Sequence, residues 1–163
     1  MIVDLAVPGD VPTIMTVERT PGFEDLVGRW SREEHLAEMA KPSVRYFVGR
    51  EADAIVAFAI VQGLEDSDRK AHLKRIAVSR PGAGIGTELL CEVIRWVFTQ
   101  TETNRLDLDV FAGNERAKRA YEKAGFVTEG LLREYHRMAD GTYRDMWLMS
   151  ILRREWAERD SCG

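Results

Sequence analysis

The most informative chemical feature of this chain is a segment with three glycines in five positions, Gly82, Gly84 and Gly86. It stands between an extended-looking run, 72–78, and an amphipathic run that begins near Thr87. Glycine lets the backbone turn with several N–H groups pointing inward, and the start of a helix adds a partial positive charge. The pattern therefore predicts a strand, a loop and a helix that together hold a phosphate-bearing ligand.

Two common phosphate-binding loops do not fit this segment. A Walker loop needs a lysine after its last glycine, whereas Gly86 is followed by Thr87 and Glu88. The dinucleotide fingerprint needs a third glycine in Gly-x-Gly-x-x-Gly, and that position is Leu89. Taken alone, the glycines are explained equally well by a tight strand-to-helix turn without a ligand.

A second segment favours the ligand site. Residues 106–111 alternate between apolar and mostly polar side chains, as strands do, and the next segment can be a helix capped by Asn114 and Gly125. At this point the chain resembles the GCN5-related N-acetyltransferase superfamily, with a strand, a Gly-x-Gly loop, a helix, a strand and then Asn-x-x-Ala-x-x-x-Tyr-x-x-x-Gly-Phe. The resemblance covers about residues 44–152. Its later part is similar to the branch that contains the ribosomal-protein and polyamine acetyltransferases.

The resemblance implies acetyl-CoA as a co-substrate. The amides of the glycine loop would bind its pyrophosphate, and the N–H of Ile76 or Val78 would face the thioester oxygen while the pantetheine arm pairs with this strand. Pro81 stands where the family usually has Gln or Arg, which leaves Arg80, one residue earlier, as the side-chain candidate. The expected cofactor contacts are Ile76, Val78, Arg80, Gly82, Ala83, Gly84, Ile85, Gly86, Thr87 and Asn114.

Tyr121 is the first candidate catalytic residue, because it matches the family tyrosine that lies near the sulfur of coenzyme A. A phenol with a pKa near 10 can give the departing thiolate a hydrogen bond or, with modest help, a proton. The structural alternative is a ring that only packs on the sheet.

His72 is the candidate general base. It lies six residues before Val78 and, by simple strand alternation, shares its face, where some superfamily members carry a glutamate base. A solvent-exposed strand residue is the alternative, and a mechanism without any base also stays open. Phe23 and Trp30 are candidates to line an acceptor pocket. The further base candidates are Glu18, Glu24, Glu33, His35, Glu134 and His136.

The pattern along the chain predicts an α/β fold, in which a mixed sheet of about seven strands has helices on both faces, in agreement with the resemblance. Ser31 and Glu34 form a capping box, and Asp10 is predicted to cap an earlier helix that contains Pro12. A length of 163 residues fits one domain, 1–163. The strands of two predicted hairpins are 44–51, 55–63, 127–138 and 143–152.

Composition narrows the partners. A net charge of −4 argues against non-specific binding of nucleic acid and favours a cationic partner such as an amine. No apolar run approaches the roughly 20 residues of a membrane span, and the N-terminus lacks the features of a signal peptide, so we expect a cytoplasmic protein without membrane contacts. The two cysteines, Cys91 and Cys162, suggest neither a disulfide framework nor a metal site.

Together these features predict an acetyl-CoA-dependent N-acetyltransferase that transfers the acetyl group directly to an amine in a ternary complex. Two alternatives remain, a non-catalytic acyl-CoA-binding or regulatory module of the same fold, and a protein that binds another nucleotide. Protein N-termini, polyamines, amino acids and aminoglycosides all stay open as acceptors. The final hairpin is a candidate surface for a homodimer.

Overall fold

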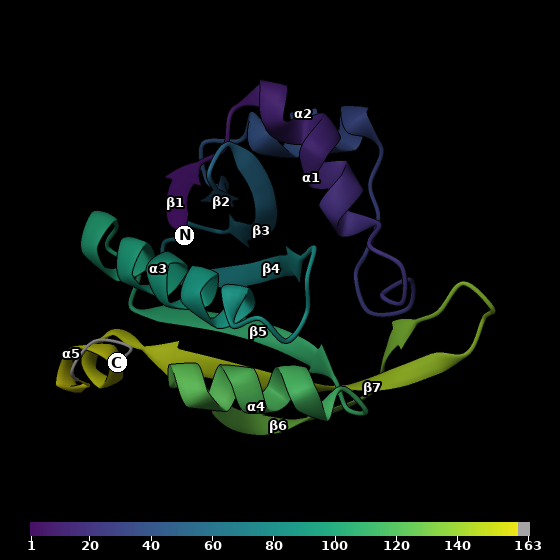
Figure 1. The fold of residues 1–163 in the computed structure, drawn as a ribbon. Helices are drawn as coiled ribbons and strands as arrows, with labels where there is room; N and C mark the ends of the chain where they lie inside the picture. The colour runs from purple at the N-terminus through teal and green to yellow at the C-terminus, as the bar shows by residue number, and fades with distance from the viewer. Residues whose placement is uncertain (160–163) are drawn as a thin grey trace.

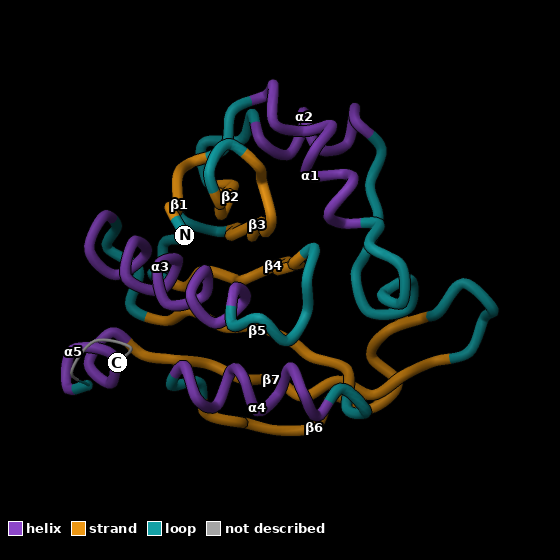
Figure 2. The backbone as a smooth tube through the Cα atoms, viewed as in Figure 1, coloured by secondary structure: helices purple, strands orange, loops and turns teal. Residues whose placement is uncertain are grey.

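The computed structural model describes residues 1–159, whose strands form one seven-stranded sheet in the order β1-β2-β3-β4-β5-β7-β6 (Figures 1 and 2). The strands are β1 Ile2–Leu5, β2 Arg45–Glu51, β3 Ala54–Gln62, β4 Lys70–Val78, β5 Arg105–Phe111, β6 Val127–Arg137 and β7 Tyr143–Leu152. The α-helices are α1 Val11–Glu18, α2 Arg32–Met39, α3 Ile85–Gln100, α4 Glu115–Ala124 and α5 Arg153–Glu158. No helix in this part of the chain is long and apolar enough to cross a membrane.

Helices cover both faces of the sheet, as the sequence predicts. On one face, α3 buries Leu89, Val93 and Val97 in a core shared with β3, β5 and β7. On the other face, α1 and α2 lie over β2 and β3, and a second core forms around Ile14 and Phe58. The sheet lies between the two cores, so the side chain of each strand residue faces either the α3 side or the α1 side.

The sheet opens between β4 and β5. These two strands are parallel, and only three residue pairs join them: Lys70–Arg105, Ala71–Leu106 and His72–Asp107. Beyond these pairs the strands separate toward the glycine loop, as Figure 2 shows. The edge of β4 that faces β5 is therefore without a strand partner over most of its length.

A β-bulge in β4 changes which residues face which side. Leu73 pairs with Val61, but Arg75 pairs with Ile60, so Lys74 is an extra residue in the strand. Leu73 accordingly packs in the α3-side core and Ala77 in the α1-side core, although simple alternation would put both on one face.

Because of this bulge, His72 and Val78 lie on opposite faces of the sheet. Val78 packs against the α3-side core. His72 sits in register with Gln62, next to the α3-side residue Val61, and so points to the other side. The expectation that His72 shares the face of Val78 is wrong.

Local capping signals are largely confirmed. Ser31 Oγ accepts from Glu34 N at 3.1 Å, and Glu34 Oε2 accepts from Ser31 N at 2.6 Å. Asn114 caps α4 by accepting from Ala117 N at 3.2 Å.

Asp10 stands at the predicted cap position of α1 but makes no capping bond. Pro12 has no N–H to offer it, and its carboxylate binds Val7 N and Arg50 instead.

Cys91, on α3, is half-buried and disulfide-bonded, so the expectation of no disulfide is wrong for this residue. Cys162 lies outside the described residues.

The end of α3 is held by one arginine from the far end of the chain. Arg153 donates from Nη1 to Phe98 O at 2.5 Å, from Nη2 to Thr101 O at 2.7 Å, and from Nε to Thr103 O at 3.0 Å. Phe98 lies in the last turn of α3, and Thr101 and Thr103 follow it, so these carbonyls would otherwise have few partners. Arg153 thus ties the helix that begins at the glycine loop to the end of β7.

We predict that Arg153→Ala lowers the free energy of unfolding by about 2–3 kcal/mol, because several charge-assisted hydrogen bonds are lost together. Urea unfolding followed by circular dichroism measures this. Arg154→Ala is the matched control, since Arg154 is an exposed neighbour, and it should change the value by less than about 0.5 kcal/mol. Equal effects of the two substitutions would contradict the prediction.

Candidate active site

A cleft of about 760 Å³ lies where β4 and β5 separate. Residues from both sides of the sheet line it. From the α3 side come the glycine loop and α4, and from the α1 side come the segment 20–29 and the tip of the β6–β7 hairpin. Among the described residues, this cleft is where the glycine loop and the Tyr121 motif meet. It therefore connects the two faces of the sheet through the gap.

The glycine loop supplies backbone donors at one end of the cleft. Gly82 and Gly84 have φ values of 86° and 79°, a conformation that favours glycine, and Gly84 stands directly before α3. The N–H groups of Thr87 and Glu88 bond back to Gly84 O at 3.1 Å. The N–H groups at positions 85 and 86 have no acceptor within residues 1–159. Two free amides at a helix start are a suitable site for an anion.

Arg80 lines the cleft near this loop, but its guanidinium is paired with Glu51 of β2. Both side chains are about half exposed, so this ion pair can exchange readily with solvent or a ligand. The contribution of Arg80 to phosphate binding stays a prediction.

Tyr121 lines the cleft from α4, where its ring packs edge-on against Phe126 at a centroid distance of 5.9 Å. Burial raises the pKa of Tyr121 to about 12, and the nearby carboxylate of Asp109 adds to this shift. The phenol is therefore fully protonated at neutral pH and can donate a hydrogen bond to a group in the cleft. Its raised pKa favours donation of a hydrogen bond over complete transfer of the proton.

His72 does not line the cleft. Its Nδ1 lies 2.6 Å from Asp107 Oδ1, and its Nε2 lies 3.6 Å from Asp109 Oδ2. Burial alone would raise the pKa of Asp107, but the hydrogen bond from His72 and the charge of Arg105 lower it. Of these groups it is Asp109 that reaches the cleft.

Asp109 lines the cleft but is not among the candidates that the sequence predicts. The alternation of residues 106–111 places Leu106, Leu108 and Val110 in the α3-side core and the two aspartates on the opposite face. The alternation alone therefore indicates which face Asp109 occupies. It does not indicate that β4 diverges from β5 and leaves the edge of β5 open beside Asp109.

His136 reaches the cleft by way of an irregularity in β6. Leu132 pairs with Met146 and His136 with Arg144, so three residues of β6 stand opposite Asp145 alone. Asp145 Oδ1 accepts from Glu134 N at 2.7 Å and holds this bulge. The ring of His136 then stands edge-on to Phe111 at 5.3 Å. Such a bulge places His136 in the cleft, and Glu134 is not among the residues that line it.

Glu18 lies at the centre of a buried polar network behind the cleft. Its side chain is fully buried, and Oε1 accepts from Arg75 Nη1 at 2.5 Å and from His35 Nε2 at 3.1 Å. Oε2 accepts from Arg19 Nη1 at 2.9 Å and from Trp30 N at 3.3 Å. Burial lowers the pKa of Arg75, and the charge of Glu18 opposes this effect. The carboxylate thus joins α1, α2 and β4.

Two side chains hold the His35 ring. A carboxylate only accepts, so Nε2 donates to Glu18, and Nδ1 forms a hydrogen bond of 3.0 Å with the Tyr46 hydroxyl. With every polar group occupied in this way, Glu18 and His35 have no access to a substrate. Of the remaining candidates, Glu24 and Phe23 line the cleft, whereas Glu33 and Trp30 do not.

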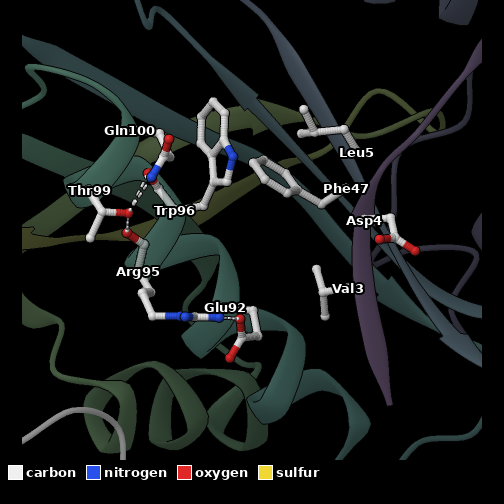
Figure 3. Close-up of a pocket in the computed structure, with 9 residues that line it drawn as sticks. All are labelled: Val3, Asp4, Leu5, Phe47, Glu92, Arg95, Trp96, Thr99 and Gln100. Atoms are coloured by element: carbon white, nitrogen blue, oxygen red, sulfur yellow. Dashed lines mark hydrogen bonds and ion pairs between the residues drawn. The ribbon is translucent and has the colours of Figure 1, made fainter.

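A second hollow, of about 290 Å³, lies between β1 and α3 (Figure 3). The rings of Phe47 and Trp96 pack edge-on at 5.2 Å on its wall, and Arg95 is paired with Glu92. It is remote from the glycine loop, and its charged groups are already paired, so it is a surface depression beside the first strand.

Residues 13–126 match the sequence model of the acetyltransferase (GNAT) family. The chain is 32% identical over 97 residues to a Bacillus subtilis (strain 168) protein named ribosomal N-acetyltransferase YdaF, which covers 59% of this chain and 52% of that protein. It is 32% identical over 84 residues to spermidine N(1)-acetyltransferase of Vibrio cholerae, covering 52% and 48%. The matched part spans about half the length of these curated relatives.

Solved structures agree in fold. Spermidine N-acetyltransferase from Vibrio cholerae, in complex with CoA and spermine, has a TM-score of 0.84 at 22% identity and covers 96% of this chain and 98% of its own. The ribosomal-protein-S18-alanine N-acetyltransferase from Escherichia coli has a TM-score of 0.77 at 24% identity, with 93% and 92% covered. At such identities the likeness concerns the fold alone.

The buried network makes a specific prediction about stability. Glu18→Gln and Arg75→Met should each lower the free energy of unfolding by about 3 kcal/mol. The first leaves the buried Arg75 without its carboxylate, and the second leaves the buried Glu18 with Arg19 as its remaining guanidinium partner. The double variant should lose clearly less than the sum, since it removes both charges. Urea unfolding of the four proteins measures the coupling, and strictly additive losses would show that the pair is not energetically linked.

Proposed function

The chain belongs to the acetyltransferase (GNAT) family, and on this premise we propose that it is an acetyl-CoA-dependent N-acetyltransferase that acts by direct transfer in a ternary complex. The observation that carries the proposal is the cleft through the gap between β4 and β5, with free loop amides at one end and a protonated Tyr121 in its wall. Cofactor and acceptor can enter such a cleft from opposite faces of the sheet.

Coenzyme A fits the α3 side of this cleft. Its pyrophosphate would accept from the amides of Ile85 and Gly86, and its pantetheine arm would pair with the open edge of β4. Val78 and Ile76, which lie on the α3 side, would place an N–H at the thioester oxygen. Developing negative charge on that oxygen would then be stabilised by a fixed backbone dipole.

The reaction forms a bond between the neutral amine nitrogen and the thioester carbon and breaks the carbon–sulfur bond. Tyr121 would donate a hydrogen bond to the departing thiolate, which leaves as coenzyme A once it gains a proton. The amine must lose a proton, and Asp109, which extends from β5 beside the gap, is the lining carboxylate that we propose takes it, directly or through water. His72, 3.6 Å from Asp109, would act through this carboxylate rather than on the substrate.

The similar proteins carry names that refer to ribosomal, spermidine and aminoglycoside acetylation. For this chain the common element is an amine acceptor. A cytoplasmic location and a homodimer formed through the final hairpin stay predictions.

Free-thiol release from acetyl-CoA across a panel of amines and peptides tests the proposal. We predict that Tyr121→Phe lowers kcat by roughly 100-fold for the accepted amine class, with the KM for acetyl-CoA changed less than about twofold. Tyr135→Phe is the matched control, since Tyr135 is 59% exposed on β6 and outside the cleft. Binding of coenzyme A with no turnover of any amine would favour the non-catalytic module.

The glycine loop is tested by a second substitution. Gly84→Ala forces a side chain into the left-handed region and should cost about 1 kcal/mol of cofactor binding, which is roughly a fivefold rise in Kd for coenzyme A. Gly9→Ala, at an open position far from the cleft, should leave the Kd unchanged. Calorimetry with coenzyme A and with ATP measures both, and a preference for ATP would indicate a nucleotide-binding protein instead.

A further inference from the structure

Arg75 lies at the floor of the cleft, on the side away from the glycine loop. The bulge at Lys74 turns it toward α1, where its guanidinium stacks on the Trp30 ring at 4.3 Å. Although the residue is only 8% exposed, it belongs to the lining of the cleft. A nearly buried cation thus borders the space in which the acceptor would bind.

Part of this guanidinium is unused. Nη1 donates to Glu18, while Nε and Nη2 have no acceptor within the described part of the chain. In that part, the Thr128 hydroxyl is the one fully buried side-chain polar atom without a partner, so the unpaired nitrogens of Arg75 keep some exposed surface, and Arg75 lines the cleft. They present hydrogen-bond donors in a fixed planar arrangement.

The backbone of the segment 20–31 passes close to the guanidinium group of Arg75. A Cβ added at Gly28 would stand 2.5 Å from Arg75 Nη2, so a glycine is needed where this segment crosses the guanidinium. The ion pair with Glu18, the stacked Trp30 ring and the backbone at Gly28 leave the Arg75 side chain little freedom to move. Its donors are therefore oriented before any ligand arrives.

The charges around Arg75 favour an oxygen over an ammonium group. Glu18 carries one negative charge and is paired with two guanidinium groups, those of Arg75 and Arg19, which leaves the floor positive. On the facing strand, Asp109 borders the same cleft and attracts the amine. The exposed charged residues that line the cleft are mixed in sign and screened by solvent: Glu24, Asp25, Arg29, Lys74, Arg80 and Arg116.

We propose that Arg75 binds a carbonyl or carboxylate oxygen adjacent to the acceptor's amine, so that the acceptor is an α-amino carbonyl compound, such as a peptide N-terminus, and not a polyamine. The inference rests on the proposed N-acetyltransferase function. An α-amino carbonyl compound carries both groups that the cleft matches, an amine for Asp109 and an oxygen for Arg75. A polyamine has no oxygen, and it would leave the donors of Arg75 unpaired beside a like charge.

The test compares three acceptors, alanine amide, sec-butylamine and spermidine, by thiol release from acetyl-CoA. Arg75→Lys keeps the charge beside Glu18 but loses the planar donors. It should lower kcat/KM for alanine amide by about 10- to 100-fold and change the values for the other two amines less than about twofold. The ratio of variant to wild type for each acceptor cancels differences in amine reactivity.

Two further variants test whether the effect of Arg75→Lys comes only from a change in the structure of the protein. Arg19→Lys changes the other guanidinium on Glu18, which lies outside the cleft lining, and should leave all three acceptors within about twofold of wild type. Gly28→Ala should displace Arg75 without altering it and so reproduce the selective loss for alanine amide.

An equal loss for all three acceptors in Arg75→Lys, or a wild-type preference for spermidine, would overturn the inference and leave the proposed function intact. Calorimetry of alanine amide with the protein–coenzyme A complex distinguishes recognition of the acceptor by Arg75 from catalysis of acetyl transfer. Binding that disappears in Arg75→Lys without any thiol release would support the recognition site and refute the catalysis. Neither binding nor release would refute both.

Discussion

The parallel pairing of β4 with β5 ends after three residue pairs, and the cleft exists because it ends there. If β4 and β5 were paired along their full length, the sheet would separate the α3 side from the α1 side, and neither strand would have a free backbone edge at the cleft. Here the early pairs fix the spacing of the two strands, and their divergence gives one cavity access to both faces. The helices pack on each face of the sheet through separate cores. The cleft and the free edge of β4 thus both depend on the point at which hydrogen bonding between β4 and β5 stops.

Much of this arrangement could be predicted from local sequence. The glycine loop, the Asn114 cap and the Ser31–Glu34 box are set by neighbours within a few residues, and so are the two hairpins. Local steric and capping rules act over such distances, which is why the sequence alone predicts these features. The motif spacing around Tyr121 likewise indicated the family before the fold was known.

The remaining features depend on contacts distant in sequence. Whether Lys74 forms a bulge is decided by how β4 aligns with β3, and no local pattern distinguishes it from ordinary alternation. His72 was therefore assigned to the wrong face. Glu18 and Arg75 are 57 residues apart, and their pairing requires α1 to pack on β4, so each appeared in the sequence only as an isolated charge. The role of Asp109 required knowing that its neighbouring strand turns away.

The bulge at Lys74 has a consequence for how this strand can vary. After it, odd-numbered positions of β4 contact the α1 side and even-numbered positions the α3 side, while a single cavity spans both. A change at position 75 or 77 can thus alter the α1-side wall of the cavity while the α3-side wall, formed by 76 and 78, keeps its side chains. The alternating positions of β4 thus form two sets, and substitutions in one set leave the other set unchanged. Insertion or deletion of one residue would instead move each set to the opposite face of the sheet.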